Sequence, residues 1–168
     1  FPLAILSTRT NPDVKTLEFH DTHRLKSGEV VQREWIITGA DKFGLPTATD
    51  DDVVLGLICL TVDQGFRDQK VYFSRYQLLK ILRWSTEGRS YQRLARSLDR
   101  LSGVRIRATN AFFDNSEKAY QTCNFGIIDA YEIIDGRATR ESEALGEGQG
   151  SSFFIWSEVM FNSFQKGF

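Results

Sequence analysis

The chain has 168 residues, of which 41% are hydrophobic and 26% are charged, and its net charge at pH 7 is −1. This length suits one domain, or one domain with an appended lobe, and the apolar content is ample for a sizeable core. The densest apolar stretch, residues 53–60, is much shorter than the roughly 20 residues that a membrane helix needs, so we expect no membrane partner.

The first third of the chain predicts a β-hairpin followed by a buried helix. Residues 14–20 and 29–38 alternate between apolar and polar side chains, which is typical of two paired strands. Thr49 is expected to cap the helix, with three aspartates in the first turn where the helix dipole favours anions. Residues 53–62 are apolar nearly all round, so we expect this helix to be buried on most sides.

Two polar clusters in this part resemble metal sites only superficially. Residues 20–23 contain two histidines and one aspartate in a predicted turn, which supplies too few ligands and no fixed geometry. Residues 50–52 are adjacent aspartates on a helix, so their side chains point in different directions. We therefore expect no metal and no other cofactor.

Charge is concentrated between residues 70 and 107. This stretch contains ten Lys or Arg residues and two acidic ones, a local balance of +8, so the rest of the chain carries −9. A concentrated positive surface is what binding to a phosphate backbone requires, because Lys and Arg neutralise phosphates and release counterions. The alternative is an ordinary solvated helix face.

A short strand and a first helix begin this basic stretch. Residues 71–73 are predicted to form the strand. Ser74, followed three residues later by Gln77, is a capping-box pattern that opens the helix. The packing face of this helix is expected to include Tyr76 and Trp84.

A second helix is predicted at residues 91–102, after a turn at residues 85–89. Ser90 suits the N-cap, and Gly103 suits a left-handed residue after the last turn. Helical periodicity places Leu94, Ala95, Leu98 and Leu101 on the core side, and Arg93, Arg96 and Arg100 on the solvent side. Two short helices, a Gly-containing turn and a basic second helix are typical of a helix-turn-helix.

Strands are predicted after the basic helix. Residues 104–113 and 120–134 read as a hairpin, with Arg105 and Arg107 on its polar face. We expect this hairpin to be the wing of a winged-helix domain, and residues 153–161 to form a last strand that joins the wing sheet.

The predicted fold class is α+β: a winged helix, with a three-helix helix-turn-helix core and a β-hairpin wing, plus an N-terminal β-hairpin. Residues 1–48 would be an extension and hairpin packed on the core, and residues 49–168 the DNA-binding winged-helix domain. Two cysteines, Cys59 and Cys123, are typical of buried thiols in a reducing compartment, which predicts a cytoplasmic location.

Several motifs make the chain resemble the plasmid replication initiator protein A family. They are Phe-Pro-Leu-Ala at 1–4, Gly-Leu-Pro-Thr-Ala-Thr-Asp at 44–50, Phe-Ser-Arg-Tyr-Gln-Leu-Leu at 73–79, Gly-Arg-Ser-Tyr-Gln-Arg-Leu at 88–94 and Ser-Leu-Asp-Arg-Leu-Ser-Gly at 97–103. The resemblance implies a bacterial, often plasmid-borne initiator that binds origin DNA and recruits host replication proteins. It also implies that this chain is the first of two winged-helix domains in a longer protein, with possible homodimer contacts.

The resemblance and the charge pattern together predict the DNA contacts. Arg89, Ser90, Gln92, Arg93, Arg96 and Arg100 occupy the turn and the solvent face of the expected recognition helix. Gln92 and Arg93 would read base edges, and Ser90 would hold a phosphate. Arg105, Arg107 and Lys118 would contact DNA from the wing.

Three other functions compete with duplex origin binding. A winged-helix transcription regulator or a single-stranded DNA-binding replication protein would share the fold and the charge. A rolling-circle nicking enzyme would use Tyr72 and Tyr76, but a His-hydrophobic-His ligand pair is missing, and Tyr76 fits the packing face of its helix. The chain also lacks a phosphate-binding loop motif and a hydrolase elbow, so we expect no enzyme and no catalytic residues.

Overall fold

The fold combines helices with two separate antiparallel sheets. The computed structural model describes residues 13–25, 27–114, 119–134 and 152–165. One sheet contains β1 (Thr16–Arg24), β2 (Val30–Thr38), β4 (Arg105–Asp114) and β5 (Ala119–Phe125), in the order β1-β2-β4-β5. The other contains β3 (Lys70–Phe73), β6 (Ile128–Glu132) and β7 (Ser152–Trp156), in the order β3-β7-β6. The described helices are α1 (Ala48–Asp63), α2 (Arg75–Ile81), α3 (Gly88–Gly103) and α5 (Glu158–Gln165).

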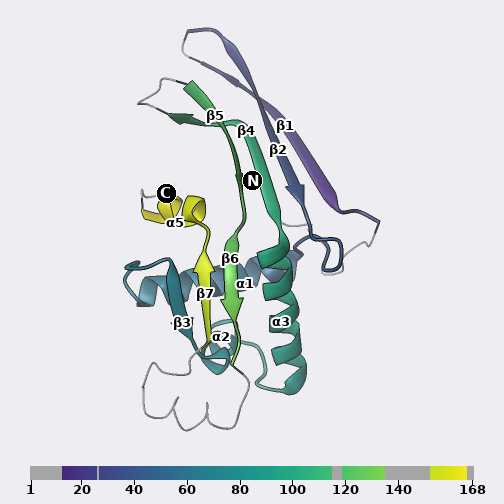
Figure 1. Ribbon diagram of the computed structural model, residues 1–168, viewed down its shortest axis with the longest axis vertical. Helices are drawn as coiled ribbons and strands as arrows, with labels where there is room; N and C mark the ends of the chain where they lie inside the picture. The colour runs from purple at the N-terminus through teal and green to yellow at the C-terminus, as the bar shows by residue number, and fades with distance from the viewer. Residues whose placement is uncertain (1–12, 26, 115–118, 135–151, 166–168) are drawn as a thin grey trace.

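The four-stranded sheet joins the two predicted hairpins edge to edge. Strands β1 and β2 pair antiparallel from Thr16 opposite Thr38 to Arg24 opposite Val30, which confirms the N-terminal hairpin. Strand β2 then pairs with β4, so that Thr38 lies opposite Arg105. Figure 1 shows this sheet extending away from the helices, with β4 leaving directly from the end of α3. The hairpin after α3 is therefore continuous with the N-terminal hairpin, and the separation of residues 1–48 from the rest stays a prediction.

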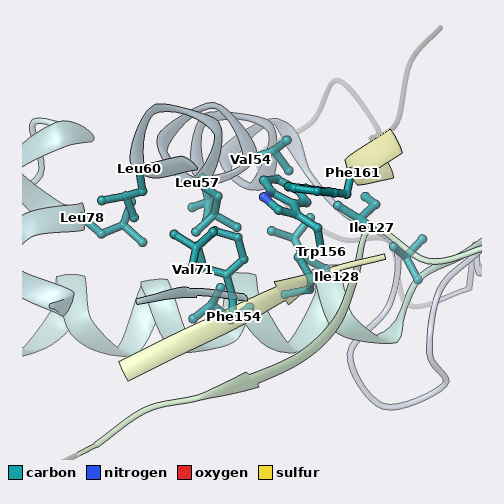
Figure 2. Packing of buried hydrophobic residues seen from close by; sticks show 14 of the residues in the cluster. Val54, Leu57, Leu60, Val71, Leu78, Ile127, Ile128, Phe154, Trp156 and Phe161 are labelled. Carbon is teal, nitrogen blue, oxygen red and sulfur yellow. The ribbon is translucent and has the colours of Figure 1, made fainter. Parts of the chain in front are cut away.

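The core lies mainly between α1 and the three-stranded sheet. Figure 2 shows Leu57 of α1 close to Phe154 and Trp156 of β7. These two aromatic rings meet edge to face, with centroids 5.2 Å apart, and both side chains are fully buried. The indole N–H of Trp156 donates to Thr61 Oγ1 at 2.9 Å, so the polar atom of the largest core residue is satisfied.

Helix α1 differs from the sequence prediction at its start and on one side. Thr47 is the N-cap, rather than Thr49, because Asp50 three residues later completes a capping box with it. The helix is also less buried than predicted: Leu55 is 61% exposed and Val62 is 54% exposed. The apolar run thus covers the core on one side and faces solvent on the other.

Helices α2 and α3 confirm the predicted helix pair with two changes. Ser74 caps α2, since its Oγ accepts from the backbone N–H of Gln77 at 3.0 Å. Helix α3 begins at Gly88 instead of Tyr91, and Gly103 is its last helical residue rather than a left-handed cap. A Cβ at Gly103 would lie 2.8 Å from the Cβ of Ala40, so close approach explains this glycine.

The C-terminal predictions need two corrections. The expected strand at residues 120–134 is broken into β5 and β6 at Gly126, and the two parts enter different sheets. The expected strand at residues 153–161 is β7 followed by α5, and β7 pairs with β3 and β6 instead of the hairpin after α3. Phe161 of α5 is buried against the core, which explains why this apolar segment resembled a continued strand.

Candidate nucleic-acid interface

A row of arginines lies along one side of α3. Its buried side is formed by Leu94, Ser97, Leu98 and Leu101. The four arginines at 89, 93, 96 and 100 are spaced by four, three and four residues, which places them on a single helical face. The sequence predicted Arg93, Arg96 and Arg100 on this face and Arg89 in the preceding turn, whereas Arg89 lies inside α3. The four arginines do not share one environment.

Arg100 is turned inward onto a buried carboxylate. Its Nε donates to Asp50 Oδ2 at 2.7 Å and its Nη2 donates to Asp50 Oδ1 at 2.8 Å. The Arg100 side chain is 16% exposed and that of Asp50 is fully buried. The prediction that Arg100 faces solvent is therefore wrong, because the first turn of α1 lies opposite this end of α3 and supplies a matching anion.

Asp50 links the start of α1 to α3. In addition to the two bonds from Arg100, its Oδ2 accepts from the backbone N–H of Thr47 at 2.7 Å and from Thr47 Oγ1 at 3.0 Å. Four donors therefore satisfy both oxygens of this buried carboxylate. Among the described residues, every fully buried side-chain polar atom has a hydrogen-bond partner.

Arg93 is exposed but held in place. Its Nη2 donates to Thr49 Oγ1 at 3.0 Å, and its guanidinium carbon lies 4.2 Å from the centroid of the Trp84 ring. A planar guanidinium stacked on an indole is stabilised by the quadrupole of the ring. The orientation of Arg93 is thus set from both sides, by α1 and by the segment after α2.

A recess of about 360 Å³ separates the start of α1 from α3. It is lined by Thr47, Thr49, Arg89, Gln92, Arg93, Arg96 and Arg100. Arg89 and Arg96 are exposed, and within the part of the chain that the structure describes neither forms an ion pair. The recess therefore brings together five of the predicted DNA contacts, and of its four guanidinium groups only that of Arg100 is paired with a carboxylate of the described residues.

The two polar residues predicted beside these arginines, Ser90 and Gln92, also differ in their surroundings. Gln92 is exposed and lines the recess. Ser90 is half-buried and lies outside the recess lining, with its Oγ 2.9 Å from the Oγ of Ser85 across the turn. The hydroxyl of Ser90 therefore bridges the turn before α3, whereas Gln92 remains available to a partner.

The cations predicted on the hairpin form a second group. Arg105 and Arg107 are both exposed on β4, with Val104 and Ile106 buried as the alternation predicts. Arg105 donates through Nε to Asn124 Oδ1 at 3.3 Å and through Nη2 to the Asn124 carbonyl at 3.4 Å. Neither arginine lines the recess, and Lys118 lies outside the described residues.

Acidic residues of α1 border this basic face. Asp51, in the first turn, and Asp52, just after it, are both exposed. Desolvation raises the pKa of Asp51, and its neighbours Asp50 and Asp52 raise it further. Neither Asp51 nor Asp52 lines the recess, so its lining holds four guanidinium groups and no carboxylate side chain.

The residues that sequence analysis missed are those that organise the arginines. Thr47, Thr49 and Asp50 come from the start of α1, and Trp84 comes from the connection between α2 and α3. One local signal could have found part of this set, because Thr47 followed by Asp50 three residues later is a capping pattern. The contact with Arg100, 50 residues away, left no local signal.

The residues considered for metal binding and nicking are dispersed. His20 and His23 lie on strand β1 rather than in a turn, and their odd spacing directs them to opposite faces. Asp21 is hydrogen-bonded to Arg33, whose Nε donates to Asp21 Oδ1 at 2.8 Å. This bond lowers the pKa of Asp21. Tyr76 is 48% exposed, so its assignment to the packing face of α2 is wrong. The described residues contain no cluster of three potential metal ligands.

Comparison with protein families identifies the chain. A family model described as Replication initiator protein A matches residues 2–145, which is most of the sequence. The chain belongs to the replication initiator protein A family. The resemblance drawn from the motifs is confirmed, and the arginine row described above lies entirely within the part of this initiator that the family model matches.

Two crystal structures resemble the fold of this replication initiator. A structure of RctB domains 2–3 (RctB-155-483) superimposes with a TM-score of 0.59 at 11% identity and covers 94% of the chain. A selenomethionine derivative of domains 2 and 3 of RctB superimposes with a TM-score of 0.61 at 14% identity and covers 97%. The initiator spans 57% of each of these chains, and at such low identity the likeness concerns the fold alone.

Two further observations leave the family assignment unchanged. No curated protein sequence matches this initiator. In the described parts of the chain, no helix combines the length and the apolar character needed to span a bilayer.

Proposed function

We propose that this replication initiator binds duplex DNA of its origin through the arginine row of α3. The observation that carries the proposal is the convergence of Arg89, Arg93, Arg96 and Arg100 on one recess, beside the exposed Gln92. Guanidinium groups neutralise backbone phosphates and release counterions, so such a surface binds a polyanion. Membership of an initiator family supports DNA of a replication origin as that polyanion.

We further propose that the helical part is a winged helix. Helices α2 and α3 are joined by a short connection, α1 packs beside them, and the β3-β7-β6 sheet completes the unit. In this arrangement the paired strands β6 and β7 would belong to the wing, rather than the β4–β5 hairpin that the sequence predicted. Residues 135–151, between these two strands, lie outside the described residues.

The contacts favour different roles for the predicted site residues. Gln92 is exposed on α3 and can donate to and accept from an adenine edge, which supports a base-reading role. Arg89 and Arg96 are suited to phosphates. Arg105 and Arg107, on β4, would add phosphate contacts outside the recess, together with Lys118.

Selection of bound duplexes from a random pool tests this function. The purified chain should enrich a defined sequence, and binding should weaken steeply as salt rises. Gln92→Ala should relax the preference at one position. Enrichment of no sequence, together with binding that does not depend on salt, would contradict the proposal and favour a protein partner for the basic face.

A separate measurement tests the contribution of β4. Arg105→Ala should weaken binding to all duplexes alike, since a phosphate contact carries no base preference. If Arg105→Ala instead changed the selected sequence, β4 would be a base-reading element. Direct repeats compared with a single palindrome in the same assay would separate an initiator from a transcription regulator, and a single-stranded competitor would reveal a preference for melted DNA.

We propose binding rather than nicking, although Tyr72 and Tyr76 are both accessible, at 46% and 48% exposed. The opposite faces of β1 on which His20 and His23 lie support this choice, because the two cannot hold one metal together. Incubation with origin DNA and a divalent metal should yield no covalent tyrosyl adduct. An adduct that is lost in Tyr76→Phe would establish nicking.

The remaining expectations concern the whole protein. The family assignment supports recruitment of host replication proteins and action in the bacterial cytoplasm. A homodimer is a further proposal, which light scattering of the purified chain over a range of concentrations would test.

A further inference from the structure

The recess between α1 and α3 is rich in donors. Each guanidinium carries five N–H donors in a plane and no acceptor. Arg93 uses Nη2 for Thr49, and Arg100 uses Nε and Nη2 mainly for Asp50, which leaves other N–H groups on both side chains. Arg89 and Arg96 are exposed on the same rim. A compact anion with several acceptor oxygens would complement this arrangement.

Thr49 adds a hydroxyl from the start of α1, whereas the N-cap residue Thr47 is already engaged. The backbone N–H of Thr47 donates to Asp50 Oδ2, and Thr47 Oγ1 donates to the same oxygen, so both groups are already used. Thr49 Oγ1 accepts from Arg93, and no described residue accepts the hydroxyl proton of Thr49, so this proton can be donated to a bound oxygen. Recognition would therefore depend on arginines, with Thr49 as an additional donor.

We propose that this recess is a phosphate-binding site, in which Arg89 and Arg96 contact the oxygens while Arg93 and Arg100 hold the walls in place. In the complex with DNA the occupant is one backbone phosphodiester, an identity that rests on the function proposed above. This proposal changes the role that the sequence predicted for Arg93. Arg93, held by Thr49 and close to the Trp84 ring, supports the wall of this phosphate site instead of reading a base.

Charge makes a phosphate the best-matched occupant. Four guanidinium groups line the recess, and Asp50, the nearest acid, already accepts both Arg100 bonds. Base edges present donors as well as acceptors, whereas a phosphodiester presents only acceptors, which suits a lining made mostly of donors. A free phosphate or the phosphates of a nucleotide share this chemistry, so the source of the phosphate has to be decided by experiment.

The first experiment compares two arginine variants in duplex binding. Arg96→Gln removes a charge at the recess, and Arg67→Gln removes the same charge from an exposed position after α1 that does not line it. Affinity is measured from about 50 to 200 mM salt with a random-sequence duplex. Arg96→Gln should weaken binding roughly tenfold and reduce the slope of log K against log salt by about 0.9, while Arg67→Gln keeps the slope of the parent. Arg96→Lys should restore the slope, since Lys also neutralises a phosphate.

The second experiment titrates inorganic phosphate and ATP into the protein without DNA. Trp84 is the reporter, because the guanidinium of Arg93, which lines the recess, lies 4.2 Å from its ring. Phosphate should change the tryptophan fluorescence, and the change should be lost in both Arg96→Gln and Trp84→Phe.

The outcomes separate this inference from the proposed function. If duplex binds and Arg96→Gln behaves like Arg67→Gln, the recess proposal is overturned while DNA binding stands. If inorganic phosphate or ATP perturbs Trp84 but no duplex binds, the recess is a phosphate site and origin binding through α3 fails. If neither phosphate nor duplex binds, both proposals fall.

Discussion

Arg100 and Arg96 of α3 carry the same guanidinium group in different environments, and we call them the inner and the outer arginine. Arg100 and Arg96 are one helical turn apart on the same face, yet Arg100 is 16% exposed and paired with Asp50, whereas Arg96 is exposed and unpaired among the described residues. Arg93 is intermediate, because it is exposed but tied to Thr49 and Trp84. The environment across from each arginine, rather than its place in the row, decides whether it stabilises the fold or meets a partner.

The recess therefore combines arginines that are bonded to α1, Arg93 and Arg100, with arginines that are exposed, Arg89 and Arg96. The inner residues connect α3 to the first turn of α1, so the recess keeps its shape without a ligand. The outer residues retain their hydration and charge, so they can release water and counterions to a phosphate. In a binding surface that is preorganised in this way, fewer side chains have to be ordered on binding, so the entropic cost of binding is lower.

The largest expected effect is the loss of the inner pair. Arg100→Ala should lower the free energy of unfolding by about 3 kcal/mol, because it leaves the fully buried Asp50 without its cation. Urea denaturation measures this. A double-mutant cycle with Asp50→Ala should show strong coupling between the two sites. A loss near zero in Arg100→Ala would show that the pair is not formed and would erase the difference between inner and outer arginines.

The next effect concerns Asp99, three residues after Arg96 on α3, which accepts a hydrogen bond from β6. Tyr131 Oη donates to Asp99 Oδ1 at 2.6 Å, and burial together with this carboxylate raises the pKa of Tyr131 to about 12. Tyr131→Phe should cost about 1.5 kcal/mol, since the hydrogen bond involves a charged acceptor.

The same contact predicts a pH dependence. A phenol whose pKa is raised on folding stabilises the folded state fully below its unfolded pKa of about 10, and this stability is lost as pH rises toward 12. Unfolding of the parent should therefore become easier between pH 10 and 12, and Tyr131→Phe should show a smaller change in that window. Parallel pH profiles of the two proteins would contradict the assigned hydrogen bond.

Arg93 should give a smaller effect on stability. Arg93→Ala removes one hydrogen bond to Thr49 and the stacking on Trp84, which together are expected to contribute about 1 kcal/mol at an exposed site. Trp84 fluorescence should also shift, since the cation leaves its ring. Arg93→Lys is the matched control, because it keeps the charge but loses the planar stack.

The smallest effect on stability is expected at Arg96. Arg96→Ala should change the free energy of unfolding by less than about 0.5 kcal/mol, since no described residue pairs with it. DNA binding should nevertheless fall more than in any other variant with unchanged stability. If Arg96→Ala lowered the free energy of unfolding as much as Arg100→Ala, the distinction between Arg96 and Arg100 would be wrong.

Local pattern was sufficient for several features of this initiator. The N-terminal hairpin, the cap at Ser74, the amphipathic α3 and the alternation of Val104, Arg105 and Ile106 all depend on neighbours within a few residues. The charge of the stretch from residue 70 to residue 107 and the motifs of the family are likewise properties of the sequence alone.

Strand partners could not be predicted in the same way. Strands β5 and β6 are separated only by Gly126 and Ile127, yet they pair in different sheets, and β7 returns to β3 from the far end of the chain. Alternation indicates which side of a strand is buried, but it carries no information about which other strand lies beside it. The boundary at Gly103 also depended on a distant residue, Ala40.

The amino-acid sequence by itself determined that Arg93, Arg96 and Arg100 would lie along one face of a helix, because helical periodicity is a local property. Only the tertiary structure decided that Arg100 would meet Asp50, that Arg93 would rest on Trp84, and that Arg96 would remain exposed. The contact of Arg100 with Asp50 arises when α1 packs across α3, which brings a carboxylate 50 residues away within 2.8 Å of a guanidinium.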